Sequence, residues 1–354
     1  MRMLGGSPLA TLSLLALSAC LACSGEDSSP AAGPTPTASA SNTPPPPAST
    51  SSGNPAAPAP GTAETPNDGL AMAGGGAIDP GTSSAGSDDG TTPDPGPALP
   101  ALACERSVTE ANKATVSAAI DELFVQGDIT AVDRYWGEPY LQHNPIAASG
   151  VTTFRNLFAG LISPGNSIYS LSRIVAECEL VLIHGDYTSF GGPTFDMFRV
   201  VDGRIVEHWD AAATGAGPNG SGHTALDGAT GVEDVELTRQ NEALVLRFVD
   251  EVLIGGARAA LGNYLSPTLV EHDPQSSDGA DAYGANLQAR QVTYRAVRRE
   301  IADGNFVFVL SEGAVGNTDV AHYDLFRVEG DRIVEHWNGR RDVPATTQSG
   351  LGIF

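Results

Sequence analysis

Basic residues are scarce in this chain of 354 residues. There are 19 Lys and Arg against 42 Asp and Glu, which gives a formal net charge of −23 at pH 7. Nucleic-acid binding depends on Lys and Arg contacts to phosphates, so we expect no nucleic-acid partner. The same charge repels anionic surfaces, so contact with a membrane requires an anchor.

Large apolar residues are scarce in residues 24–103, where Pro, Ser, Thr, Ala and Gly predominate. Such a segment cannot bury enough apolar surface to offset the entropy cost of ordering its backbone. We therefore predict a disordered linker there. Residues 104–354 have the composition of folded domains.

Apolar runs long enough to cross a bilayer are also missing. The run from Leu9 to Leu17 is too short for a permanent span, and it is typical of a signal peptide. The segment Leu17-Ser18-Ala19-Cys20 resembles the lipobox of bacterial lipoproteins. The resemblance implies that residues 1–23 are a lipoprotein signal peptide and lipobox and that Cys20 carries lipid. The protein would then be exported and held by lipid alone on the cell envelope, at the periplasmic or surface side of the outer membrane. Lipidation of Cys23, or an ordinary secretory signal, is the alternative.

Only four cysteines occur, and two of them belong to the signal region. Cys104 and Cys178 remain in the folded part, where oxidising conditions outside the cytoplasm permit a disulfide. Such a bond would join the N-terminal arm of the first domain to a strand. Two unpaired thiols are the alternative, because a sequence does not show whether two backbones approach closely enough.

The folded part contains an internal repeat. Residues 198–209 (FRVVDGRIVEHW) return as 326–337 (FRVEGDRIVEHW), an offset of 326 − 198 = 128. Upstream, Gln142-His143-Asn144-Pro145 recurs as Glu271-His272-Asp273-Pro274. A period this long indicates two whole domains and not a solenoid.

We expect tandem domains at residues 104–213 and 235–354, with a Gly-rich linker over 214–234. In the first copy a helical stripe runs from Val108 to Gly127. The turn at Asp202-Gly203 is a hairpin signal. Helices followed by an antiparallel meander predict an α+β fold. The other predicted elements are a helix over 152–161 and strands over 167–176, 180–184, 194–200 and 204–211.

The motifs of the first copy resemble those of SnoaL-like proteins, a branch of the nuclear transport factor 2-like superfamily that includes polyketide cyclases, scytalone dehydratase and ketosteroid isomerase. The resemblance rests on Gln142–Pro145, His184, Asp196–Arg199 and Gly203–Asp210. It implies two cone-shaped domains, each with N-terminal helices packed on a curved, mostly antiparallel sheet, paired through the outer faces of their sheets as an intramolecular pseudo-dimer. It does not imply a function, since this fold hosts enzymes, binding modules and subunits without catalysis.

Polar residues of the first copy gather on one predicted strand face. Strand alternation places Asp196 with Phe198 on one strand. On the next strand it places His208 with Val206 and Asp210. The resemblance implies that this face lines the cone. The catalytic candidates are Asp210, Asp196, His208, His184, His143 and Asn144, with Phe198 and Val206 as ligand contacts.

We call the apolar space enclosed by the cone of each domain its cup. Such a space shifts pKa values, because burial raises the pKa of a carboxyl group and lowers that of a histidine. The hypothesis is that Asp210 acts as acid and base, that Asp196 orients or stabilises an oxyanion, and that the histidines relay protons. The resemblance also implies that the first copy is not a ketosteroid isomerase, because that enzyme's base falls on Asn144 and its tyrosine on Ile120.

Structural roles are the alternatives for these residues. Asp196 could pair with an arginine such as Arg173, and a buried histidine is often satisfied by core neighbours. We expect no cofactor and no metal. His143, His184 and His208 could bind Zn²⁺ together with Asp196, but the chain lacks a closely spaced His pair on a helix.

The second copy keeps some of these groups and loses others. The replacements are Leu310 for His184, Asn338 for Asp210 and Asp273 for Asn144. The ligand-binding candidates that remain are His272, Asp273, Asp324 and His336. Asp273 with Asp324 restores an isomerase-like carboxylate pair, but we favour the first copy as the active one because it keeps both its histidine and its second carboxylate.

One functional hypothesis and two alternatives follow. The hypothesis is a cofactor-independent enzyme of the cyclase, isomerase or dehydratase type, which does acid–base chemistry next to a carbonyl of an apolar small molecule. The alternatives are a non-catalytic lipoprotein that binds such a molecule and a scaffold of the cell envelope.

Overall fold

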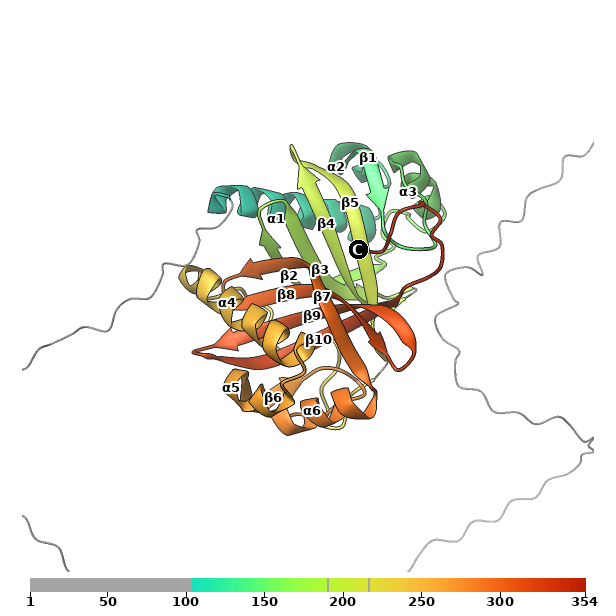
Figure 1. Ribbon diagram of the computed structural model, residues 1–354. Helices are drawn as coiled ribbons and strands as arrows, with labels where there is room; N and C mark the ends of the chain where they lie inside the picture. The colour runs from blue at the N-terminus through green and yellow to red at the C-terminus, as the bar shows by residue number, and fades with distance from the viewer. Residues whose placement is uncertain (1–103, 190, 216) are drawn as a thin grey trace, which may run out of the picture. The chain divides into compact units, whose positions relative to one another are not determined.

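The computed structural model describes residues 104–189, 191–215 and 217–354, and the same order of elements occurs twice in it (Figure 1). The first half contains α1 (Arg106–Ile120), a π-helical turn (Asp121–Val125), α2 (Ala131–Tyr135), β1 (Trp136–Gln142), α3 (Val151–Phe158), β2 (Tyr169–Glu177), β3 (Leu180–Tyr187), β4 (Gly192–Val201) and β5 (Arg204–Ala213). The second half contains α4 (Thr238–Phe248), a π-helical segment (Val249–Ile254), α5 (Leu261–Tyr264), β6 (Leu265–Glu271), α6 (Ala280–Ala289), β7 (Val292–Asp303), β8 (Phe306–Val315), β9 (Thr318–Glu329) and β10 (Arg332–Asp342). Short 3-10 helices span Val235–Leu237 and Arg258–Ala260.

The α+β class is confirmed, and the predicted helices and strands of the first copy lie where they were expected. Gly127 ends the first helical stripe with a φ of 78°, and an added Cβ there would lie 2.0 Å from the Ser163 carbonyl oxygen. The predicted signal peptide, lipid anchor and long linker lie outside the described residues. None of the described helices is long and apolar enough to cross a membrane.

All ten described strands belong to one sheet, which the sequence did not predict. Its order is β2-β3-β4-β5-β10-β9-β8-β7, with β1 parallel to β5 and β6 parallel to β10. The β5–β10 ladder that joins the halves is short and antiparallel, with Ala213 opposite Gly339 and Ala212 opposite Arg340. A Cβ on Gly339 would lie 2.8 Å from the Phe195 ring, so glycine permits this close crossing.

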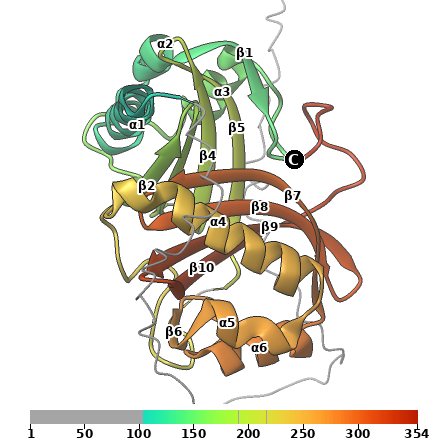
Figure 2. The same ribbon diagram turned by 60° about the vertical axis from the view of Figure 1, so that its left-hand side comes forward.

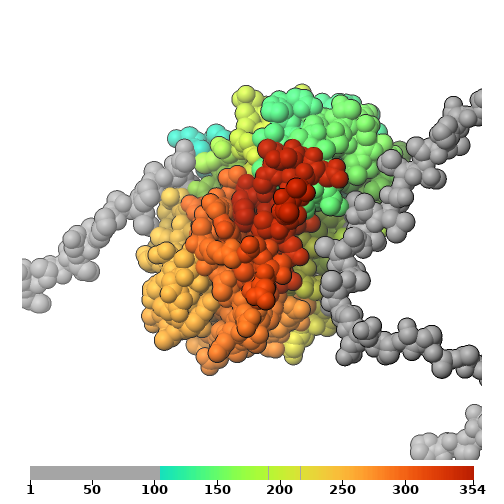
Figure 3. Space-filling view, turned by 45° about the vertical axis from the view of Figure 1, so that its right-hand side comes forward, coloured from blue at the N-terminus to red at the C-terminus, as the bar shows by residue number. Residues whose placement is uncertain are grey.

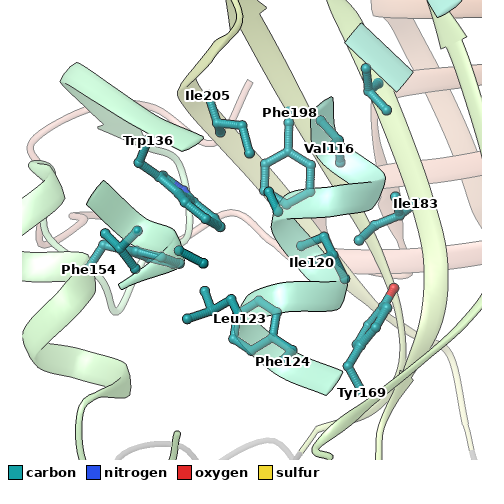
Figure 4. Close-up of a cluster of buried hydrophobic side chains, with 14 of the residues drawn as sticks. Val116, Ile120, Leu123, Phe124, Trp136, Phe154, Tyr169, Ile183, Phe198 and Ile205 are labelled. Carbon is teal, nitrogen blue, oxygen red and sulfur yellow. The ribbon is translucent and has the colours of Figure 1, made fainter. Parts of the chain in front are cut away.

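Helix α1 covers β2 and β3, and α4 covers β7 and β8 in the same way (Figure 2). Between α1 and its sheet lies the core of the first half, where Ile120 lies between Phe198 and Phe124 (Figure 4). A matching core around Phe248 and Phe326 fills the second half.

A third core draws side chains from both halves. Met197 and Trp209 of the first half pack with Phe308 and Trp337 of the second. These four side chains are almost completely buried. Burial of a large apolar side chain contributes about 1.5–3 kcal/mol, so this core is a major contribution to the stability of the molecule.

A disulfide holds the start of the described region, and two hydrogen bonds hold its end. Cys104 and Cys178 form a disulfide with their Cα atoms 5.6 Å apart, which ties the start of α1 to the β2–β3 turn. The segment after β10 lies on the first half (Figure 3), where Gln348 N donates to the Pro145 carbonyl at 2.9 Å and His143 Nδ1 donates to the Gly352 carbonyl at 2.5 Å.

We predict that Glu242→Gln stabilises the protein above neutral pH. Glu242 of α4 is buried beside Glu177 of β2. Burial and the charge of Glu177, opposed by Arg239, together raise the pKa of Glu242 from 4.5 to about 7. A carboxyl with a raised folded-state pKa costs stability as pH rises from 4.5 through 7. Urea unfolding at pH 8 should show the variant more stable by on the order of 1–3 kcal/mol, and the difference should vanish near pH 4.5. A variant that is less stable at pH 8 would contradict this account.

Candidate functional site

Asp196, His208 and Asp210 lie together on the helix-facing side of the first half. The β4–β5 register places Asp196 opposite Asp210 and Phe198 opposite His208. His208 Nε2 lies 3.0 Å from Asp196 Oδ1, and His208 Nδ1 lies 2.9 Å from Gln142 Oε1. The predicted juxtaposition of the three polar groups is therefore confirmed. Burial raises the pKa of Asp196, although the hydrogen bond with His208 opposes this rise.

Asp210 is paired with the second half. Arg341 of β10 donates to one carboxylate oxygen, and Asn144 Nδ2 donates to the other at 2.7 Å. Burial would raise the pKa of Asp210, but the charges of Arg341 and His208 hold it below its ordinary value. An ionised carboxylate bound by an arginine is a weak proton acceptor. The arginine also opposes a cation, although the ligand atoms of Asp196, His208 and Asp210 lie within 4.8 Å of one another.

His184 does not line the cup, so that prediction was wrong. The register places Ile183, and not His184, opposite Asp196. His184 therefore faces the shared core, where its ring stacks on Phe195 at 3.9 Å and its Nδ1 lies 2.7 Å from Arg173. Arg173 is thus no partner of Asp196 either.

A β-bulge also changes which β5 side chains enter the first core. Val200 pairs with Ile205 while Arg199 pairs with Glu207, so Val206 has no opposite residue. Ile205 is fully buried in the core, whereas Val206 is only half-buried and lies outside it. The prediction that Val206 contacts a ligand was therefore wrong.

The Arg, Glu and Trp of the repeated motif build a structural network on the opposite side of the sheet. In the second half His272 stacks on Trp337 at 4.6 Å, its Nε2 lies 2.9 Å from Glu335 Oε1, and Arg327 Nε donates to Glu335 Oε2 at 2.6 Å. The matching residues of the first half are His143, Trp209, Glu207 and Arg199. The expectation that His143 relays protons in the cup and that His272 contacts a ligand there was wrong, because both rings face away from it.

In the second half a buried histidine lies between two carboxylates. His336 Nδ1 is 3.1 Å from each oxygen of Glu271, and His336 Nε2 is 3.1 Å from Asp324 Oδ1. Burial alone would lower the pKa of His336, but the charge of Glu271 and the hydrogen bonds to both carboxylates raise it to about 10. The imidazole is therefore protonated at neutral pH. In the first half Gln142 stands in place of Glu271, so His208 has one carboxylate partner.

A cavity of about 20 Å³ lies beside this array, with room for about one water molecule. Tyr283, Tyr294 and His336 line it. Among the described residues, the Tyr283 hydroxyl and Asp324 Oδ2 are buried and have no hydrogen-bond partner. Such buried polar atoms are uncommon in proteins.

The two tyrosines are hydrogen-bond donors in this site. Burial raises the pKa of Tyr283 and of Tyr294 well above the ordinary value, and the charge of Asp324 adds to the shift. The Tyr294 hydroxyl donates to Asp324 Oδ1 at 3.4 Å. Both hydroxyls therefore keep their protons at neutral pH.

Asp273 is fully engaged at the edge of the same cavity. Arg290 donates to it at 2.6 Å, Thr214 Oγ1 at 2.6 Å and Asn338 Nδ2 at 3.1 Å. Burial would raise the pKa of Asp273, but these hydrogen bonds and the charge of Arg290 lower it. The predicted carboxylate pair is present in the second half, but only Asp324 has an oxygen without a partner.

Several residues of this site were not predicted from the sequence. The change from Gln142 to Glu271, directly before the repeated histidine, was a readable signal that the two cups differ. Tyr283 and Tyr294 gave no such signal, since neither belongs to the repeated motif. Arg341 acts on the other half of the chain, which no local pattern indicates.

No protein-family profile and no curated protein matches the chain. Three solved structures match parts of it: a putative ketosteroid isomerase from Kribbella flavida DSM 17836 (20% identity, 30% of this chain, 82% of that chain, TM-score 0.28), a putative SnoaL-like polyketide cyclase from Jannaschia sp. CCS1 (18%, 31%, 91%, 0.26) and a steroid delta-isomerase from Pseudomonas aeruginosa (25%, 30%, 81%, 0.26). Because these TM-scores are low, the chemistry proposed below rests on the site itself.

We predict that Glu271→Gln, which copies the first half, lowers the pKa of His336. NMR of the ring signals should show no titration of His336 between about pH 5 and 8.5 in the parent protein and a titration inside that window in the variant. Since the folded-state pKa is raised, the array stabilises the parent fully below pH 6.5 and loses this contribution as pH rises through 10.

Gln142→Glu is the matched reverse change, because it gives His208 the second carboxylate that His336 already has. A parent His336 that titrates near pH 6.5 would show that the array does not hold the proton.

Proposed function

We propose that the second half carries a cofactor-independent acid–base site of the cyclase, isomerase or dehydratase type, acting on an apolar small molecule with a carbonyl group. One observation carries the proposal: Tyr283 and the protonated His336 line a cavity, the Tyr283 hydroxyl is buried without a partner, and His336 binds Asp324, whose Oδ2 is also buried without a partner. The first half is the weaker candidate, because Arg341 donates a hydrogen bond to the Asp210 carboxylate and so makes it a weak proton acceptor. This choice reverses the preference drawn from the sequence.

Each group has a defined task in the proposed reaction. Asp324 Oδ2 accepts a proton from the carbon next to the substrate carbonyl. Tyr283 donates a hydrogen bond to the carbonyl oxygen as negative charge develops on it, while the Tyr294 hydroxyl stays on Asp324 Oδ1. His336 holds Asp324 through Oδ1, which leaves Oδ2 directed to the substrate. The proton then returns from Asp324 to a carbon of the product, so no cofactor is consumed.

Substrate entry requires a movement at the edge of the cavity. The cavity has room for about one water molecule, so a larger molecule must displace the Arg290–Asp273 pair or the Thr214 side chain. Both Arg290 and Thr214 line the cavity and are half-buried.

A non-catalytic binding or scaffold lipoprotein is the second candidate. The small size of the cavity and the complete engagement of Asp273 favour it. It requires no movement of Arg290, and it assigns the buried array to stability alone.

The test is hydrogen–deuterium exchange into a panel of small cyclic ketones, followed by NMR in D₂O. The proposal predicts catalysed exchange next to the carbonyl, a loss of about a hundredfold or more with Asp324→Asn, and a milder loss with Tyr283→Phe. Asp210→Asn is the matched control in the first half and should keep the activity. Loss of exchange with Asp210→Asn but not with Asp324→Asn would return the active site to the first half. An absence of exchange with every ketone would favour the second candidate.

We also propose that the protein is an exported lipoprotein whose halves are tandem SnoaL-like domains paired as an intramolecular pseudo-dimer. The matching order of elements and the third core support the pairing. The lipobox-like segment before Cys20 supports the anchor.

The anchor predicts that Cys20→Ala moves the protein from the membrane fraction to the soluble fraction, because the acyl chains supply the membrane affinity. Cys23→Ala should stay in the membrane fraction. The reverse pattern would assign the lipid to Cys23. If neither substitution releases the protein from the membrane fraction, a lipid anchor at these positions is excluded.

A further inference from the structure

A cluster of two histidines and three carboxylates lies where the segment between β5 and α4 meets the second half. His223 and Asp227 belong to that segment, and His272 follows β6. His272 Nδ1 lies 2.8 Å from Asp227 Oδ1, and His223 Nδ1 lies 3.6 Å from Asp227 Oδ2. Two ring nitrogens thus converge on the two oxygens of one carboxylate. The ligand atoms of the three residues lie within 4.8 Å of one another.

The other nitrogen of each ring faces a further carboxylate. His272 Nε2 lies 2.9 Å from Glu335 Oε1, and His223 Nε2 lies 3.3 Å from Asp278 Oδ2. Histidines that bind metals usually donate their second ring N–H to a carboxylate, because this fixes the tautomer and leaves the first nitrogen free for the ion. Both rings of the cluster have this outer support.

We propose that His223 Nδ1, Asp227 and His272 Nδ1 bind a divalent transition-metal ion of the Zn²⁺ class. Two imidazoles and a carboxylate suit Zn²⁺, whereas Ca²⁺ and Mg²⁺ prefer oxygen ligands alone. The ion replaces the proton through which His272 Nδ1 donates to the Thr224 carbonyl at 2.9 Å. It enters from solvent, since the His223 and Asp227 side chains are 33% and 44% exposed while His272 is buried.

The bound ion would fasten the segment between the halves to the second half. Gly228 permits the close approach that the site needs: its φ is 90°, and an added Cβ would lie 2.9 Å from His272 Nε2. The first half offers an internal comparison. His143 has the same glutamate and tryptophan neighbours as His272, but its Nδ1 donates to the Gly352 carbonyl at 2.5 Å, where no side-chain ligand meets it.

The test is Zn²⁺ titration of the full chain by calorimetry after dialysis against a chelator. We expect one site, a melting temperature that rises with Zn²⁺, and Co²⁺ absorption bands without thiolate charge transfer, which excludes binding by cysteine. His223→Ala and Asp227→Asn should each weaken binding by about tenfold or more. Asp227→Asn keeps the oxygen that accepts from Thr224 N at 3.0 Å, so the local turn persists.

Asp331→Asn is the matched control, because it removes the same charge at a side chain that is 87% exposed. It should leave Zn²⁺ affinity unchanged. The proposal is overturned if the folded parent binds no Zn²⁺ at about 100 µM, where a specific site would already raise stability. It is equally overturned if both His223→Ala and Asp227→Asn retain the parent's affinity.

Discussion

The pairing of β5 with β10, at Ala213 and Gly339, is the constraint on which the rest of the structure depends. It brings the apolar faces that carry Trp209 and Trp337 into one core and so removes them from water. If these apolar faces were exposed to water, they would promote association with other molecules. The same crossing makes one continuous sheet out of two sets of strands.

This crossing also decides the chemistry of the two cups. β5 and β10 are the last strands of the two halves, and each continues past the point where they pair. The residues after that point therefore reach carboxylates of the other half. Arg341 reaches Asp210 in the first half, whereas Thr214 reaches Asp273 in the second. An arginine neutralises the carboxylate that it meets, while a threonine only adds a hydrogen bond. The first cup is therefore closed by an ion pair from the other half, and the second retains a small cavity lined by Tyr283, whose buried hydroxyl has no partner.

Local patterns in the sequence were sufficient to predict the elements of the fold. Strand alternation placed Asp196, His208 and Asp210 on one face, and the Asp202-Gly203 turn identified the hairpin between β4 and β5. Alternation failed for Val206, because a bulge is invisible in a hydrophobic pattern. His184 follows a continuous apolar run, Leu180–Ile183, so alternation does not show which side of the sheet it faces.

Contacts between the halves could not be predicted in this way. The partners of Asp210 and Asp273 come from residues far away in the chain, and their arrangement depends on a two-residue ladder with no sequence signature. The repeated histidines His143 and His272 were functional candidates, yet both serve networks outside the cup, with the repeated Glu and Trp. Repetition in this chain therefore identified structure more reliably than chemistry.

Differential scanning calorimetry of the full chain tests most directly whether the halves form one unit through the shared core. If they do, residues 104–354 unfold in a single transition whose calorimetric and van't Hoff enthalpies agree. Gly339→Val, which places a side chain against Phe195 and the β5 backbone, should lower the temperature of that one transition without splitting it. Two transitions in the parent protein, with only one of them shifted by Gly339→Val, would show that the halves fold independently and would contradict the account.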